Sequence, residues 1–183
     1  MPARPITIVG IAGSLRRQSF NAALLRAAME LAPDRMSITP AAIGDLPLYD
    51  DDLRASDYPP AVEALVKAMQ AADGLLFVTP EYNRSIPGVL KNAIDWASRR
   101  PDHPFKGKPV AIMGASRGVL GTIMANHHLR QILVYLDART VGGPEVLVGD
   151  SPNRFDADLK LVHEPTREFV RAHLEKLRDA IAG

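Results

Sequence analysis

Residues 6–21 read ITIVGIAGSLRRQSFN and decide how the rest of the chain is interpreted. A β-branched apolar run ends in small residues, a polar turn follows, and a helical pattern begins near Ser19. This order predicts a strand, a loop and a helix. The loop carries hydroxyl, guanidinium and amide donors on Ser14, Arg16, Ser19 and Asn21. Because the free N–H groups and the dipole of a helix N-terminus also favour an anion, the stretch predicts a phosphate site.

The same stretch has a simpler interpretation. Any α/β protein needs a tight turn after its first strand, glycines permit such a turn, and Ser19 is an ordinary N-cap residue. Two sharper nucleotide-binding motifs are absent. Residues 10–13 do not match G-x-G-x-x-G, and no G-x-x-x-x-G-K-[ST] occurs in the chain. The stretch therefore favours a phosphate site that is neither a Rossmann fingerprint nor a P-loop.

The composition is that of an ordinary globular protein. The chain has 183 residues, of which 46% are hydrophobic and 23% charged, and its net charge is +1. This length predicts a single domain over residues 1–183. Without a long run of one charge sign, nucleic acid is not expected as a partner. The chain has no cysteine, and we predict neither a signal peptide nor a membrane span. We therefore expect a cytoplasmic protein with no membrane partner.

Strand and helix patterns alternate along the whole chain. A continuous apolar run at residues 74–79 is typical of a parallel strand that is buried on both faces. Residues 44–60 form an irregular segment, and we interpret Asp50-Asp51-Asp52 within it as a solvated acidic loop rather than a metal site. The expected strands cover residues 6–12, 36–43, 74–79, 110–115 and 140–148, the last interrupted by Gly142-Gly143-Pro144. The expected helices cover 19–31, 61–72, 85–98, 122–136 and 164–182.

Five strands that alternate with five helices predict an α/β fold with a doubly wound parallel sheet and helices on both faces. For five strands we expect the flavodoxin-like order 2-1-3-4-5. In that order the first and third strands are neighbours, and ligands bind beyond their carboxyl ends. Loops 13–21 and 80–87 follow these two strands, so the topology is expected to bring them together.

The loop after the third strand begins Pro80-Glu81-Tyr82-Asn83. Its backbone groups suit the polar edge of a flat heterocycle, and Tyr82 is placed to pack near the face of such a ring. After the fourth strand, Ser116 and Gly118 could approach the ring from the other side. The simpler alternative is a strand-to-helix connection in which prolines stiffen the chain and Ser85 caps the helix.

Two of these segments resemble the signatures of NADPH-dependent FMN reductases, a family that includes flavin, quinone, azo-dye and chromate reductases. The first is Gly13-Ser14-Leu15-Arg16-x-x-Ser19-x-Asn21, and the second is Pro80-Glu81-Tyr82-Asn83-x-Ser85-x-Pro87-x-x-Leu90-Lys91-Asn92-Ala93-Ile94-Asp95. The resemblance extends over nearly the whole chain. It implies that the first loop binds the FMN phosphate and the second the isoalloxazine. The implied cofactor contacts are Ser14, Arg16, Ser19, Asn21, Pro80, Glu81, Tyr82, Asn83 and Ser85, with Ser116 and Gly118 in a third loop.

The resemblance implies an FMN-dependent NAD(P)H oxidoreductase. Hydride from NADPH or NADH would pass to bound FMN and then to a quinone, an azo compound, a flavin or a metal oxyanion such as chromate. The cofactor carries this chemistry, so we assign no catalytic acid or base and no metal. The family also implies a homodimer or homotetramer. Two alternatives stay open, a flavodoxin-type electron carrier without its own substrate and a nucleotide-binding regulator, and the sequence does not separate NADH from NADPH.

Overall fold

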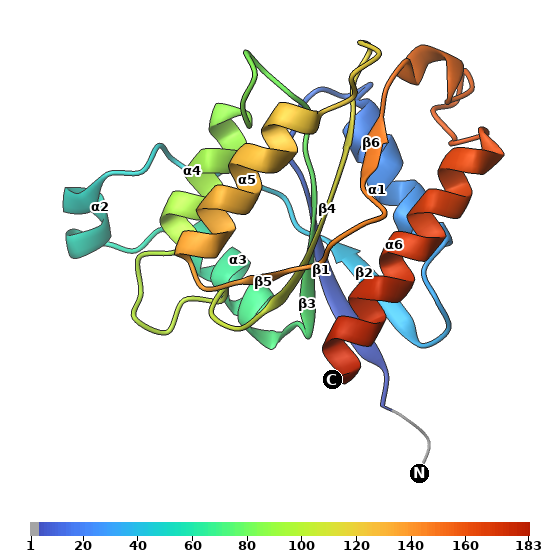
Figure 1. The fold of residues 1–183 in the computed structure, drawn as a ribbon. Helices are drawn as coiled ribbons and strands as arrows, with labels where there is room; N and C mark the ends of the chain where they lie inside the picture. The colour runs from blue at the N-terminus through green and yellow to red at the C-terminus, as the bar shows by residue number, and fades with distance from the viewer. Residues whose placement is uncertain (1–3) are drawn as a thin grey trace.

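The computed structural model describes residues 4–183 and contains a parallel sheet in the order β2-β1-β3-β4-β5, with β6 also paired to β4 (Figure 1). The predicted order 2-1-3-4-5 is confirmed, and β1 pairs with β2 on one side and β3 on the other. The strands are β1 (Ile6–Ala12), β2 (Met36–Pro40), β3 (Gly74–Val78), β4 (Pro109–Ala115), β5 (Arg139–Thr140) and β6 (Val146–Val148).

Two short strands occupy the position of the interrupted strand that we predicted at residues 140–148. β5 pairs with the start of β4 at Pro109 and Val110, whereas β6 pairs with its end from Met113 to Ala115. The chain leaves the sheet edge between them, where Gly142-Gly143-Pro144 occurs. Proline has no N–H to give to a strand ladder, and glycine weakens one, so this interruption follows from the residues themselves.

Helices cover both faces of the sheet (Figure 1), with α1 and α6 on one face and α3, α4 and α5 on the other. On β3, Leu75 and Phe77 pack against the helices α3, α4 and α5. Leu76 and Val78 point to the other face and pack against α1 and α6. This alternation confirms the strand buried on both faces. No helix in residues 4–183 has the length and apolar character to cross a membrane. The helices are α1 (Phe20–Glu30), α2 (Asp51–Ser56), α3 (Pro60–Ala71), α4 (Gly88–Ala97), α5 (Ile123–Tyr135) and α6 (Glu164–Ala182), with a 3₁₀ turn η1 at Ser151–Asn153.

The acidic triplet begins a short helix, α2, where we predicted an irregular loop. Asp50 is its N-cap, and the carboxylate accepts a hydrogen bond of 2.9 Å from the backbone N–H of Asp52. Asp51 and Asp52 occupy the first turn, where negative charge interacts favourably with the helix dipole. The carboxylates are therefore explained by capping.

Three loops gather at the carboxyl end of the sheet, away from the end of α6 (Figure 1). They are the first loop (residues 13–19, after β1), the second loop (residues 79–87, after β3) and the third loop (residues 116–122, after β4). Because β1, β3 and β4 are consecutive in the sheet, these loops are neighbours although they are far apart in sequence. They form the candidate site.

Candidate functional site

The three loops enclose a cleft of about 230 Å³. Of the eleven predicted cofactor contacts, eight line it and three, Asn83, Ser85 and Gly118, do not. Phe20, Ala115 and Arg117 also line it and were missed as site residues, although each directly adjoins a residue that we had singled out. The full lining is Ser14, Arg16, Ser19, Phe20, Asn21, Pro80, Glu81, Tyr82, Ala115, Ser116 and Arg117.

The first loop presents hydrogen-bond donors at the start of α1. Ser19 is the N-cap of α1, and its hydroxyl oxygen accepts from the N–H groups of Asn21 and Ala22, both at 3.2 Å. This arrangement confirms the capping interpretation and still leaves the hydroxyl proton free for a ligand. In residues 4–183, the backbone N–H groups of Arg17 and Gln18 make no hydrogen bond, and no carboxylate pairs with the exposed Arg16 side chain.

Asn21 differs from the other predicted donors because its amide is already occupied. The side chain is 3% exposed, Nδ2 donates to the carbonyl of Ala115 at 2.8 Å, and Oδ1 accepts from the N–H of Ala115 at 2.9 Å. This pair of bonds joins the first turn of α1 to the last residue of β4. Asn21 therefore positions the third loop relative to the first.

Glu81 makes a similar connection from the second loop. Its Oε2 accepts hydrogen bonds from the backbone N–H groups of Met124 at 2.9 Å and Ala125 at 3.1 Å, at the start of α5. Thr122, the N-cap of α5, makes no side-chain capping bond, so Glu81 satisfies N–H groups that the helix leaves free. Oε2 is thus held by α5, whereas Oε1 and the backbone of Glu81 make no such bond to the helix.

The second loop continues into a tight turn. Tyr82 and Ser85 exchange backbone hydrogen bonds of 2.9 and 3.0 Å, and the two residues between them, Asn83 and Arg84, have φ of 52° and 64°. Positive φ at both central positions is typical of a type I′ turn. The turn leaves Tyr82 51% exposed at the cleft. The hydroxyl of Ser85 lies 3.1 Å from Nδ1 of His128, and it does not cap α4 as the simpler interpretation allowed.

The third loop is held by its own hydrogen bonds and by a glycine that we did not predict. The Ser116 hydroxyl lies 2.7 Å from the carbonyl of Gly121 and 3.1 Å from that of Gly118. Gly121 has a φ of +65°, and a Cβ there would lie 2.9 Å from the backbone of Leu147. A Cβ at Gly118 would have no atom closer than 3.9 Å. The loop thus requires glycine at 121 rather than at 118.

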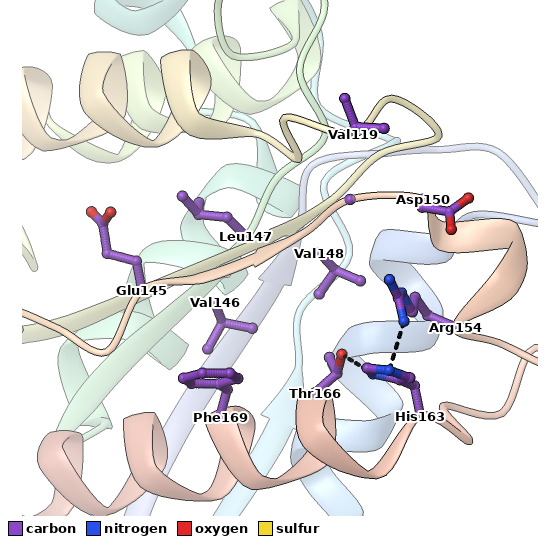
Figure 2. Close-up of a pocket in the computed structure, with 11 residues that line it drawn as sticks. Val119, Glu145, Val146, Leu147, Val148, Asp150, Arg154, His163, Thr166 and Phe169 are labelled. Carbon is purple, nitrogen blue, oxygen red and sulfur yellow. Dashed lines mark hydrogen bonds between the residues drawn. The ribbon is translucent and has the colours of Figure 1, made fainter.

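A second hollow opens between β6 and the start of α6 (Figure 2). Arg154 donates to Nε2 of His163 at 2.6 Å, and Nδ1 of His163 lies 2.8 Å from the hydroxyl of Thr166. These bonds tie the segment before α6 to its first turn. The hollow contains none of the predicted cofactor contacts, so the candidate site is the cleft.

Comparisons with known proteins agree on one family. A family model described as NADPH-dependent FMN reductase matches residues 6–153. An NAD(P)H-dependent FMN reductase from Pseudomonas aeruginosa is 51% identical and covers 94% of both chains. A 2-hydroxy-1,4-benzoquinone reductase from a Burkholderia species is 45% identical over 93% of both chains. Among solved structures, the flavoenzyme NAD(P)H:(acceptor) oxidoreductase FerB from Paracoccus denitrificans has a TM-score of 0.88 at 36% identity and covers 97% of each chain.

Proposed function

The chain belongs to the NADPH-dependent FMN reductase family, and from this premise we propose that its three-loop cleft holds FMN and that quinones are its electron acceptors. It is an FMN-dependent NAD(P)H oxidoreductase. The observation that carries the placement is the cleft itself, because residues from two motifs about sixty positions apart line one hollow at the switch point of the sheet. Neither the family model nor the relatives support an electron carrier without its own substrate.

The start of α1 fits the FMN phosphate. Arg16 lacks a carboxylate partner in residues 4–183, the Ser14 and Ser19 hydroxyls each retain a proton, and backbone N–H groups of the loop are free. A phosphate dianion satisfies all of these groups at once. We therefore assign Arg16, Ser14 and Ser19 to direct phosphate contact, and Asn21 to holding the loop in place.

The second and third loops fit the ring system. When bound, FMN supplies a site that accepts hydride and returns electrons. Pro80 and Tyr82 line the cleft from the second loop, and Ser116 lines it from the third. Glu81 anchors this wall to α5, and the type I′ turn that contains Asn83 fixes the exit of the second loop. No side chain of the cleft is needed as a catalytic acid or base.

We also propose an assembly and a location. A homodimer or homotetramer is supported by two exposed apolar residues at the end of α5, Val134 at 68% and Tyr135 at 86%. Light scattering of the purified protein tests this proposal, and a monomer at all concentrations contradicts it. We place the protein in the cytoplasm, where NAD(P)H is available, and cell fractionation with immunodetection tests that placement.

The purified protein tests the function directly. We expect FMN to bind about once per chain and more tightly than riboflavin, because only FMN reaches the donors of the first loop. Under anaerobic conditions NADPH or NADH should bleach the visible absorption of the bound flavin, and a benzoquinone should restore it faster than azo dyes, free flavin or chromate do. Equal affinity for FMN and riboflavin would show that the phosphate assignment is wrong. A flavin that ignores both nicotinamides would contradict the oxidoreductase assignment.

A further inference from the structure

Five arginine side chains in residues 4–183 form neither an ion pair nor a hydrogen bond within the protein: Arg16, Arg17, Arg26, Arg84 and Arg117. Four of these five belong to the three loops around the cleft. The exception, Arg26, lies in the second half of α1. The loops around the cleft therefore carry four unpaired arginines, two of which, Arg16 and Arg117, line the cleft itself, and the net charge of +1 does not reveal this concentration.

The same loops contain almost no negative charge. Glu81 is their one acidic residue, and both of its hydrogen bonds go to the N-terminus of α5. Within the three loops, therefore, no carboxylate pairs with the four arginines. Clustered like charges repel one another, so such a cluster is most useful for a ligand with several negative charges.

One phosphate does not account for four arginines. If Arg16 binds the FMN phosphate, three arginines remain, and we name Arg17, Arg84 and Arg117 the arginine rim. The co-substrate is the second anion that must enter this cleft. NADPH differs from NADH by a phosphate monoester on the adenosine 2′-oxygen, which adds between one and a half and two negative charges at neutral pH. A guanidinium is well suited to bind such a group with two parallel hydrogen bonds.

Of the three arginines in the rim, Arg117 is the best placed to contact a ligand in the cleft. It is the only one of the three that lines the cleft in the described part of the chain. Its guanidinium lies 5.6 Å from the centroid of the Phe20 ring, and Phe20 packs on Phe155 at 5.3 Å. An aromatic face holds a cation without neutralising its charge. The side chain is therefore supported in the cleft while its N–H donors stay free.

A second, independent observation concerns the backbone conformation of Arg84. It adopts a φ of 64° at the centre of the type I′ turn, a position that glycine and asparagine occupy at lower cost. The turn is exposed, so no packing need explains a long side chain there. A role for its charge at the mouth of the cleft does explain it.

We propose that the arginine rim selects NADPH over NADH by binding the adenosine 2′-phosphate, with Arg117 as the principal specificity residue. The proposal rests on the function proposed above and deepens it. It assigns a substrate preference that the sequence left open.

The test uses the FMN-loaded wild type, Arg117→Gln and the matched control Arg26→Gln, which removes an unpaired arginine away from the cleft. Calorimetry measures the affinity for adenosine 2′,5′-bisphosphate and for adenosine 5′-monophosphate, two unreactive probes that differ only in the 2′-phosphate. We expect Arg117→Gln to weaken binding of the bisphosphate about tenfold or more and that of the monophosphate less than about threefold. Arg26→Gln should change neither.

Steady-state kinetics supply the second readout. The kcat/KM for NADPH should fall about tenfold in Arg117→Gln while that for NADH stays within about threefold, and added salt should weaken the bisphosphate more than the monophosphate. Equal affinity of the wild type for the two probes, or no effect of Arg117→Gln, overturns the proposal. So does an FMN affinity that falls in parallel with probe binding, because Arg117 would then serve FMN. If FMN binds and the wild type has the same kcat/KM for NADH and NADPH, this inference alone fails. If the protein does not bind FMN, or if neither nicotinamide reduces the bound FMN, the proposed function is refuted.

Discussion

Acid should destabilise this protein through one buried histidine. His173 lies on α6 with no exposed surface, and neither ring nitrogen makes a hydrogen bond in residues 4–183. Burial lowers the pKa of His173 to about 4 from an ordinary value of 6.5. Backbone groups of Pro144 and Ile112 lie near the ring, outside the geometry of a hydrogen bond, and oppose this shift weakly, while the charge of Arg130 reinforces it. The ring is therefore neutral in the folded protein at neutral pH.

The sign of the effect follows from proton uptake. Between pH 6.5 and about 4 the unfolded chain protonates this histidine and the folded chain does not, so the unfolded state binds more protons. The free energy of unfolding is highest above this window and falls as the pH falls through it. The contribution of His173 amounts to about 3 kcal/mol once the pH is below both pKa values. About 2 kcal/mol of this is already lost at pH 5.

Urea unfolding measures the contribution when the wild type is compared with His173→Leu at pH 7.5 and pH 5.0. Leucine keeps an apolar side chain in the cavity and removes the titrating group. His127→Leu is the matched control, because His127 is an exposed histidine on α5. Saturating FMN in every sample makes any titration of the bound phosphate common to all. The wild type and the control should lose about 2 kcal/mol more than His173→Leu between the two pH values.

An identical pH dependence in the wild type and His173→Leu would refute this reasoning. It would mean that the ring is solvated or hydrogen-bonded in solution, so that its protonation does not lower the free energy of unfolding. If His173→Leu fails to fold, NMR titration of the His173 ring in the wild type gives the same answer. A pKa near 6.5 would then be the contradicting result.

Two further predictions concern the first and third loops. Arg16→Ala should weaken FMN binding about ten- to a hundredfold and more than Arg17→Ala does, measured by fluorescence titration, because a charge-assisted hydrogen bond contributes about 1.5–3 kcal/mol; equal losses would move the phosphate contact. Gly121→Ala should lower the free energy of unfolding in urea by about 1–3 kcal/mol, because its φ is positive and a Cβ would meet the backbone of Leu147. Gly118→Ala, where the added Cβ has room, should change it by less than about 0.5 kcal/mol.

Periodicity was sufficient to predict the sheet. Each apolar run forms a strand, because a short continuous apolar segment is typical of a parallel strand that is buried on both faces. The error at the acidic triplet came from local chemistry. The triplet Asp50-Asp51-Asp52 caps α2 through a side-chain bond that depends on one backbone turn. The interruption predicted at Gly142-Gly143-Pro144 is confirmed, and the two parts pair with opposite ends of β4. The cap depends on a single hydrogen bond, which a pattern of apolar residues does not encode, whereas the interruption follows from residues that cannot extend a strand.

The position of the candidate cleft could be predicted from the motifs, but the hydrogen-bond partners of its individual side chains could not. Ser14, Arg16 and Ser19 lie in the cleft with donors available, as the first motif implies. The pattern that identifies Asn21 and Glu81, however, does not say which partner their side chains have. Both partners are backbone groups of elements about forty or more residues away in sequence, Ala115 for one and the start of α5 for the other. Only the packed sheet brings them within reach.

Asn21 and Glu81 connect the three loops of the cleft to one another. The third loop carries no strong motif of its own, yet Asn21 holds its beginning and Glu81 holds its end. The two recognisable motifs therefore position a third segment that has no such motif. Because Arg117 lies on that segment between the two attachments, any selectivity it confers depends on residues of the other two loops. Substitution of Asn21 or Glu81 should then disturb discrimination between NADPH and NADH even where FMN still binds.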